Sequence, residues 1–211
     1  MKKLLALILA LAMLAALAAC SKTGGSGSTA PSADTSQQVS ASGGEGGAQS
    51  DTPTEVTITS LNGSGEAVEL TVPYDPQRVA ILDMASLDIL DALGVGSRVV
   101  GTADTSLDYL QDYISDDIAN LGTIKEADLE AVMACEPDVI FIGGRLAGSY
   151  DALSQIAPVV YLSTDTELGV VESVRKNAAT IATMFGLESE VEELMAGFDS
   201  RIAALADFAK D

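Results

Sequence analysis

The stretch Asp138-Val139-Ile140-Phe141-Ile142-Gly143-Gly144 decides the fold of this 211-residue chain. Its four central residues are all large and apolar, which is typical of a strand buried on both faces of a sheet. Shorter apolar runs at residues 79–82, 98–102 and 158–163 alternate with segments in which apolar residues have helical spacing. This alternation predicts an α/β fold, a parallel sheet covered by helices and connected by right-handed crossovers.

The segments around these strands complete the predicted architecture. Residues 56–61 and 67–72 alternate apolar and polar side chains around a Gly-rich turn, which predicts a β-hairpin. The predicted helices cover residues 84–93, 105–114, 128–135, 149–156 and 167–185. Residues 188–211 form a last, long helix with one apolar stripe: Val191, Leu194, Phe198, Ile202, Leu205 and Phe208. That stripe either docks on the domain or belongs to a helix that continues toward a further partner.

The first residues read as a targeting segment. Met1-Lys2-Lys3 is followed by an apolar run at residues 4–19, which is shorter than the roughly 20 residues that span a bilayer. The run ends in Leu17-Ala18-Ala19-Cys20, which resembles the lipobox of bacterial lipoproteins. That resemblance implies cleavage before Cys20 and attachment of a lipid to its thiol.

Four segments are therefore predicted. Their compositions set the boundaries, because residues 21–54 are poor in large apolar side chains and rich in Gly and Ser, as flexible linkers are. The segments are a signal peptide (1–19), a lipid-anchored tether (20–54), an α/β lobe (55–187) and the beginning of a long helix (188–211).

Composition excludes several classes of function. The chain has 31 Asp and Glu against 11 Lys and Arg, a formal charge of −20, and no His. The charge excludes a nonspecific nucleic-acid binder, and the lack of His excludes a Ser-His-Asp triad or a His-containing zinc site. The Gly-rich residues 143–148 lack the spacing of a phosphate-binding loop. We therefore predict neither an enzyme nor a resident cofactor or metal.

Ligands of open α/β sheets bind beyond the carboxyl ends of the strands. Arg145 follows the most apolar strand at that edge, where its planar guanidinium could face an anion or a carboxylate. It could instead pair with an acid, the nearest in sequence being Asp138 and Asp151. The residues alone favour neither reading. The same rule selects Asp83 and residues 102–104, 143–145 and 163–165.

Lys125 could add a second positive charge to the same rim. The residues by themselves favour a simpler role, a solvated lysine near a helix start. Thr123 and Glu126 have the spacing of a helix capping box, which is purely structural.

Several phrases together resemble the ferric-siderophore-binding lipoproteins of ABC importers, and most closely their catecholate-type branch. The similarity extends from about residue 68 to the end of the chain. The phrases that carry it are Pro73-x-x-Pro76-x-Arg78-Val79, Leu121-Gly122-x-x-Lys125-Glu126, Glu136-Pro137-Asp138 and Gly144-Arg145-Leu146.

The resemblance implies a fold of two α/β lobes joined by a long helix, with an iron(III)-siderophore held in the cleft between them. Arg145 matches an arginine that faces the anionic complex, and Lys125 matches a basic position used by some members. ABC permease subunits are the implied partners, and the lipid on Cys20 would hold the protein on the membrane. We expect it on the extracellular face of a monoderm cell rather than in a periplasm.

Members of that family continue into a second lobe, which is not among these residues. We therefore expect the chain to hold the N-terminal lobe and the start of the connecting helix. Two alternatives stay open: a cobalamin- or haem-binding relative, and a surface lipoprotein module without a transport role.

Overall fold

The structure is a computed structural model that describes residues 53–210. The predicted signal peptide, the lipid-attachment residue Cys20 and nearly all of the predicted tether lie outside the described residues.

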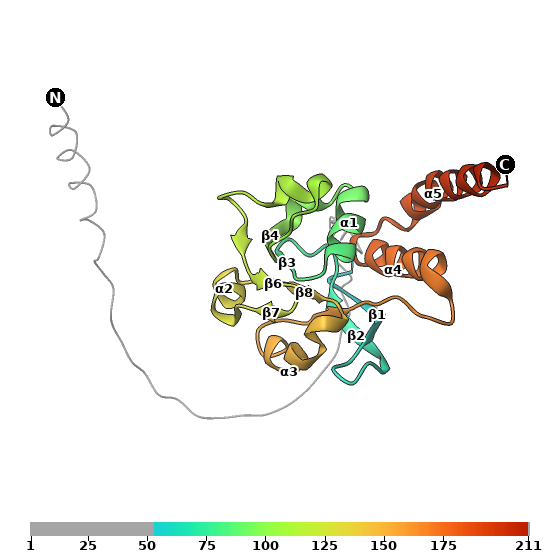
Figure 1. The fold of residues 1–211 in the computed structure, drawn as a ribbon. Coiled ribbons are helices and arrows are strands. Elements are labelled where there is room, and N and C mark those ends of the chain that lie inside the picture. Colours follow the sequence, from blue (N-terminus) through green and yellow to red (C-terminus); the bar gives the residue numbers. More distant parts are fainter. Residues whose placement is uncertain (1–52, 211) are drawn as a thin grey trace, which may run out of the picture. The chain divides into compact units, whose positions relative to one another are not determined.

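A five-stranded parallel sheet forms the centre of the fold, as predicted (Figure 1). In spatial order the strands are β5 (Ala119–Asn120), β4 (Val99–Thr102), β3 (Val79–Ile81), β8 (Val139–Ile142) and β9 (Val159–Tyr161). Three of its strands, β3, β8 and β9, are buried along their whole length, because each is covered on both faces.

The order of the strands places a reversal point in the middle of the sheet. From β3 the chain moves outward through β4 to β5, then returns to the other side of β3 and moves outward again through β8 to β9. The connections therefore diverge between β3 and β8. In open α/β sheets this is where the loops part and leave a crevice for a ligand.

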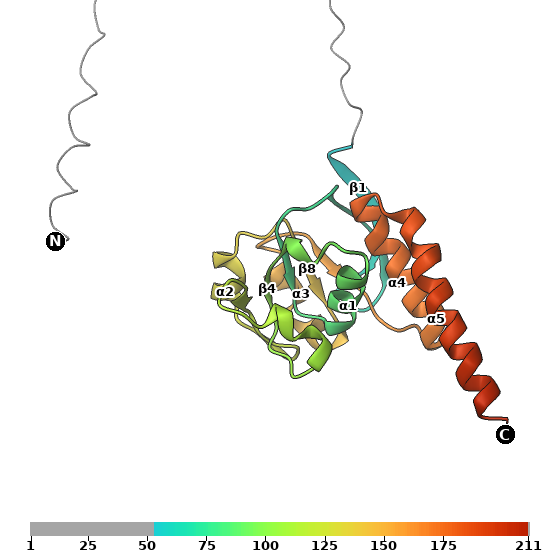
Figure 2. The same ribbon diagram turned by 90° about the horizontal axis from the view of Figure 1, so that it is seen from above.

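Helices cover both faces of the sheet (Figure 2). Successive strand residues alternate between the two faces, so Phe141 packs in one apolar cluster and Ile140 in the other. The Phe141 cluster includes α1 (Met84–Ala92) and α4 (Gly169–Phe185). The Ile140 cluster includes α2 (Leu129–Ala134) and α3 (Tyr150–Leu153).

The predicted β-hairpin is confirmed as β1 (Glu55–Leu61) and β2 (Ala67–Pro73), paired antiparallel in a sheet of their own. Ser60 attaches the hairpin to the edge of the central sheet: its Oγ accepts a hydrogen bond from Tyr161 N at 2.9 Å. The same hydroxyl donates to Tyr161 O at 3.4 Å.

Two predicted helices differ from the structure in type or in length. The segment at 105–114 contains a 3₁₀ helix, η2 (Asp108–Tyr113), which buries Leu110 and Tyr113 at three-residue spacing, while Leu107 and Ile114 remain more than a third exposed. One buried position per turn does not hold a longer helix on the domain. The helix predicted at 149–156 is present but shorter: α3 covers four residues, and the 3₁₀ helix η3 (Gly144–Ser149) precedes it.

The long helix α5 (Glu188–Phe208) is confirmed, and its two halves differ in packing. Val191 and Met195 are buried beside α4, where Arg175 and Asp199 also pair at 3.0 Å. Leu205 and Phe208 further along the same stripe are 68% and 81% exposed. In residues 53–210 no helix is both long enough and apolar enough to cross a membrane.

Candidate ligand-binding edge of the sheet

The reversal point brings Asp83 and residues 143–145 together at the carboxyl edge. Asp83 caps α1: its Oδ2 accepts hydrogen bonds from Ser86 N at 2.9 Å and Ser86 Oγ at 2.8 Å. Its other oxygen, Oδ1, faces Gly143, where an added Cβ would lie only 2.5 Å away. A side chain at position 143 would therefore displace the Asp83 carboxylate, which borders the loop that leads to Arg145.

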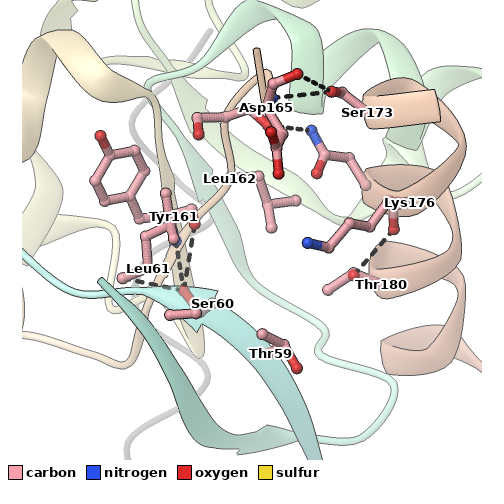
Figure 3. A pocket seen from close by; sticks show the side chains of 12 residues that line it. Thr59, Ser60, Leu61, Tyr161, Leu162, Asp165, Ser173, Lys176 and Thr180 are labelled. Carbon is pink, nitrogen blue, oxygen red and sulfur yellow. Dashed lines mark hydrogen bonds between the residues drawn. The ribbon is translucent and has the colours of Figure 1, made fainter. Parts of the chain in front are cut away.

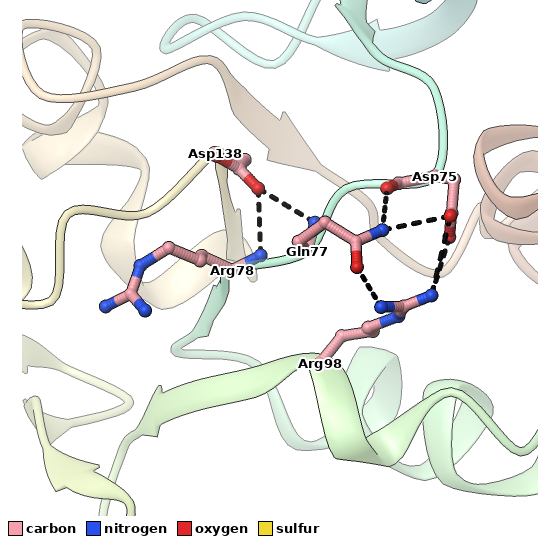
Figure 4. A network of polar contacts seen from close by, with 5 residues as sticks. All are labelled: Asp75, Gln77, Arg78, Arg98 and Asp138. Atoms are coloured by element: carbon pink, nitrogen blue, oxygen red, sulfur yellow. Dashed lines mark hydrogen bonds and ion pairs between the residues drawn. The ribbon is translucent and has the colours of Figure 1, made fainter.

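Arg145 lies in η3 with its side chain exposed at this edge. Within residues 53–210 it has no ion pair and no side-chain hydrogen bond. The reading in which it pairs with Asp138 or Asp151 is therefore not realised. Asp138 lies at the opposite edge, where its Oδ2 accepts from Gln77 N at 2.8 Å and Arg78 N at 2.9 Å (Figure 4).

The other three arginines within residues 55–187 are engaged. The Arg78 guanidinium donates to the carbonyls of Cys135 and Glu136, and Arg98 pairs with Asp75 at 3.1 Å (Figure 4). The pKa of Arg175 is raised above its usual range, first by its hydrogen bond to Asp199. Arg145 differs because its charge is available to a ligand.

Lys125 lies at the tip of a short hairpin that sequence reasoning did not predict, formed by β6 (Gly122–Thr123) and β7 (Glu126–Ala127). Its side chain is exposed and has no ion pair with a described acid. β7 packs beside η3, so the segments that carry Lys125 and Arg145 are neighbours.

The predicted capping box at Thr123 and Glu126 is wrong. Thr123 Oγ1 accepts from Lys125 N at 3.2 Å and Glu126 N at 3.1 Å, but these bonds close the β6–β7 turn and no helix starts there. Asp128 caps α2 instead, accepting from Glu130 N and Ala131 N at 3.1 and 3.0 Å. The error arises because a hydroxyl followed by free amides satisfies a turn and a helix start equally well.

A cavity of about 80 Å³ lies elsewhere, between the β1–β2 hairpin, the end of β9 and α4 (Figure 3). Lys176 lines it, whereas Arg145 and Lys125 do not. Its volume is well below the roughly 300 Å³ at which small-molecule pockets begin. This cavity is therefore not the site that Arg145 marks.

The described residues contain no group of three or more Cys, Asp or Glu side chains placed to hold a metal ion. Cys135 is 7% exposed, and burial raises the pKa of its thiol. It therefore behaves as a small buried apolar side chain.

Sequence reasoning missed Tyr161, whose hydroxyl lies at this edge beside Gly144. A tyrosine at the end of an otherwise aliphatic strand was the available signal. Because aromatic residues are common in strands, a tyrosine at that position does not by itself indicate a binding site.

Comparison with known proteins gives consistent matches. Residues 79–210 match the sequence profile of the family described as "Periplasmic binding protein". The petrobactin-binding protein YclQ of Bacillus subtilis is 38% identical over 133 residues, which are 63% of this chain and 42% of YclQ. The Fe(3+) dicitrate-binding periplasmic protein FecB of Escherichia coli is 31% identical over 140 residues, 64% of this chain and 46% of FecB.

Solved structures agree with these matches. The crystal structure of YclQ superposes with a TM-score of 0.67 and 35% identity, covering 74% of this chain and 54% of that one. The periplasmic catecholate-siderophore binding protein VctP of Vibrio cholerae gives a TM-score of 0.63 and 29% identity, covering 74% and 55%. The chain thus spans about half the length of the relatives that it matches.

Proposed function

Because the chain belongs to the periplasmic binding protein family, we propose that it is the substrate-binding component of an ABC importer for iron(III)-siderophore complexes, of the catecholate type. This family consists of binding proteins, in agreement with the prediction that the chain is not an enzyme. The relatives named for petrobactin, a catecholate siderophore and ferric dicitrate support an iron complex as the ligand.

One observation carries the proposal: the exposed guanidinium of Arg145 at the reversal point of the sheet. No described acid neutralises it, although the whole chain has a formal charge of −20. A tris-catecholate iron(III) complex is strongly anionic. Its oxygens can accept charge-assisted hydrogen bonds from Arg145, and a local positive region can attract it despite the negative charge of the whole protein.

Lys125 is the second ligand-binding residue in this proposal. Its ammonium is a mobile point charge rather than a planar donor fork. On the neighbouring β6–β7 hairpin it adds attraction at longer range and less geometric selection than Arg145.

The organisation of the whole protein is part of the proposal. Residues 55–187 form one binding lobe, and α5 begins the helix that leads to a second lobe. The exposed stripe that ends in Leu205 and Phe208 supports this, because such side chains are normally covered in the complete assembly. A lipid on Cys20 and a tether at 20–54 would hold the lobe at the outer face of the membrane, where it passes its ligand to the permease.

Calorimetric titration of the full chain with a ferric tris-catecholate siderophore tests the proposal; tryptophan quenching cannot be used, because the chain has no Trp. Arg145→Ala should raise the Kd about 10-fold or more, since hydrogen bonds to charged groups contribute about 1.5–3 kcal/mol. Lys125→Ala should weaken binding by a few-fold. The matched control is Arg201→Ala, which removes an exposed arginine without an ion pair from α5.

Equal losses in Arg145→Ala and Arg201→Ala would show that only the overall charge matters and would reject the site. Tighter binding of cyanocobalamin or haem than of the ferric catecholate would reject the ligand class.

A further inference from the structure

Tyr161 is a buried side chain whose polar end has no partner within the described part of the chain. The residue is 7% exposed, and both of its hydrogen bonds with Ser60 use its backbone. Every fully buried side-chain nitrogen or oxygen in residues 53–210 has a hydrogen-bond partner. The Tyr161 hydroxyl has none, so its oxygen must reach the surface. The ring therefore belongs to the core, and the hydroxyl can donate a hydrogen bond to a group outside the described residues.

Tyr161 is one of the residues that line the small cavity, but its ring points away from it, which places the hydroxyl at the ligand-binding edge. Figure 3 shows the ring pointing away from Lys176 and Thr180. It packs in the apolar cluster on the other face of the sheet, with Leu146 of η3. A Cβ added to Gly144 would lie 3.2 Å from the Tyr161 hydroxyl. The hydroxyl is therefore next to the residue that precedes Arg145.

Three adjacent strands build a single row of groups at this edge. β3 leads to Asp83, β8 leads to Gly143 and Gly144, and β9 ends in Tyr161. Asp83 Oδ1 borders the first glycine and the Tyr161 hydroxyl borders the second. The two glycines form a floor without side chains between a carboxylate and a phenol, and Arg145 follows directly.

From this arrangement we infer that the Tyr161 hydroxyl is a ligand contact, which donates a hydrogen bond to an anionic oxygen of the bound iron complex. The inference rests on the proposed function. The Tyr161 O–H comes from the end of β9, and the Arg145 guanidinium comes from η3, which follows β8. An anionic oxygen that lies above Gly143 and Gly144 can therefore accept hydrogen bonds from two sides. Gly144 keeps that approach open, since any side chain there would crowd the hydroxyl.

Titration of the full chain with a ferric tris-catecholate siderophore tests the inference through Tyr161→Phe. This change removes the hydroxyl and keeps the ring, so the thermal midpoint should stay unchanged while the Kd rises about 10-fold. A structural role would instead lower the thermal midpoint. Gly144→Ala should also weaken binding. Gly148→Ala in the same 3₁₀ helix should not, because nothing lies within 4 Å of its added Cβ.

The outcomes separate this inference from the proposed function. If the wild type binds and Arg145→Ala weakens binding, but Tyr161→Phe binds like the wild type, the Tyr161 contact is wrong and the proposed function stands. If the wild type does not bind the ferric catecholate, the proposed function fails, and the inference fails with it.

Discussion

Asp88 on α1 is a side chain whose ionisation opposes folding. The side chain is exposed, but partial desolvation of its carboxyl raises its pKa above the usual range, and the neighbouring charge of Asp91 raises it further. The folded chain therefore binds this proton more tightly than the unfolded chain does. The resulting stabilisation is fully present below the unfolded pKa and is lost as the pH rises through the folded pKa.

Asp88→Asn should therefore stabilise the protein at pH 7, where the wild type carries the unfavourable charge. Solvent screening limits the gain to about a few tenths of a kcal/mol. Urea unfolding of both proteins from pH 3 to pH 7 would measure the difference in their free energies of unfolding. Asp108→Asn on η2 is the control. The difference in the free energy of unfolding between Asp88→Asn and the wild type should disappear as the pH falls toward 3. A difference that grows as the pH falls would contradict the conclusion that the ionisation of Asp88 opposes folding.

At the scale of elements, the β1–β2 hairpin packs Ile58 and Val72 into the core, and the hydroxyl of Ser60 joins it to the end of β9. Ser60 is 2% exposed, and its hydroxyl satisfies both the N–H and the C=O of Tyr161. The end of β9, and with it the Tyr161 ring, is thus held by an element outside the central sheet.

Ser60→Ala should lower the free energy of unfolding by about 1–3 kcal/mol, because it leaves the Tyr161 N–H buried without its partner. Hydrogen exchange should rise first in β1 and at the end of β9. Thr57→Ala is the control: its hydroxyl meets Thr71 at 3.3 Å on the exposed face, so a change within about 0.5 kcal/mol is expected. Equal effects of the two substitutions would mean that Ser60 does not anchor the hairpin.

The sequence predicted those elements whose burial is continuous. β3, β8 and β9 were found because every residue in them is apolar and buried, and the β1–β2 hairpin because its turn residues are distinctive. The β6–β7 hairpin was not found, since strands of two residues leave no period to read. Over residues 105–114 a longer helix was predicted than the 3₁₀ helix η2, which buries Leu110 and Tyr113.

Only part of the candidate site was predictable from the sequence. Arg145 could be found because its position depends on topology, which the strand pattern reveals. The contacts of Asp83 and Tyr161 with the two glycines could not, because they join separate strands.

For the whole molecule, the distribution of charge matters more than its total. A formal charge of −20 favours solubility and repels anions at long range. Arg145 and Lys125 should attract anions locally. This attraction extends over about the screening length, roughly 8 Å at physiological salt. An anionic ligand should therefore be captured at this edge and repelled elsewhere.

The most direct test of this account is the location of bound iron(III) on the full chain, measured by paramagnetic broadening of backbone amide signals. A ferric tris-catecholate siderophore should erase the signals of residues 143–145, Asp83 and Lys125, and leave those of α5 sharp. The gallium(III) complex, which is diamagnetic, should shift the same signals without erasing them. Broadening centred on Lys176 and the cavity beside α4, or spread evenly over the domain, would contradict the account.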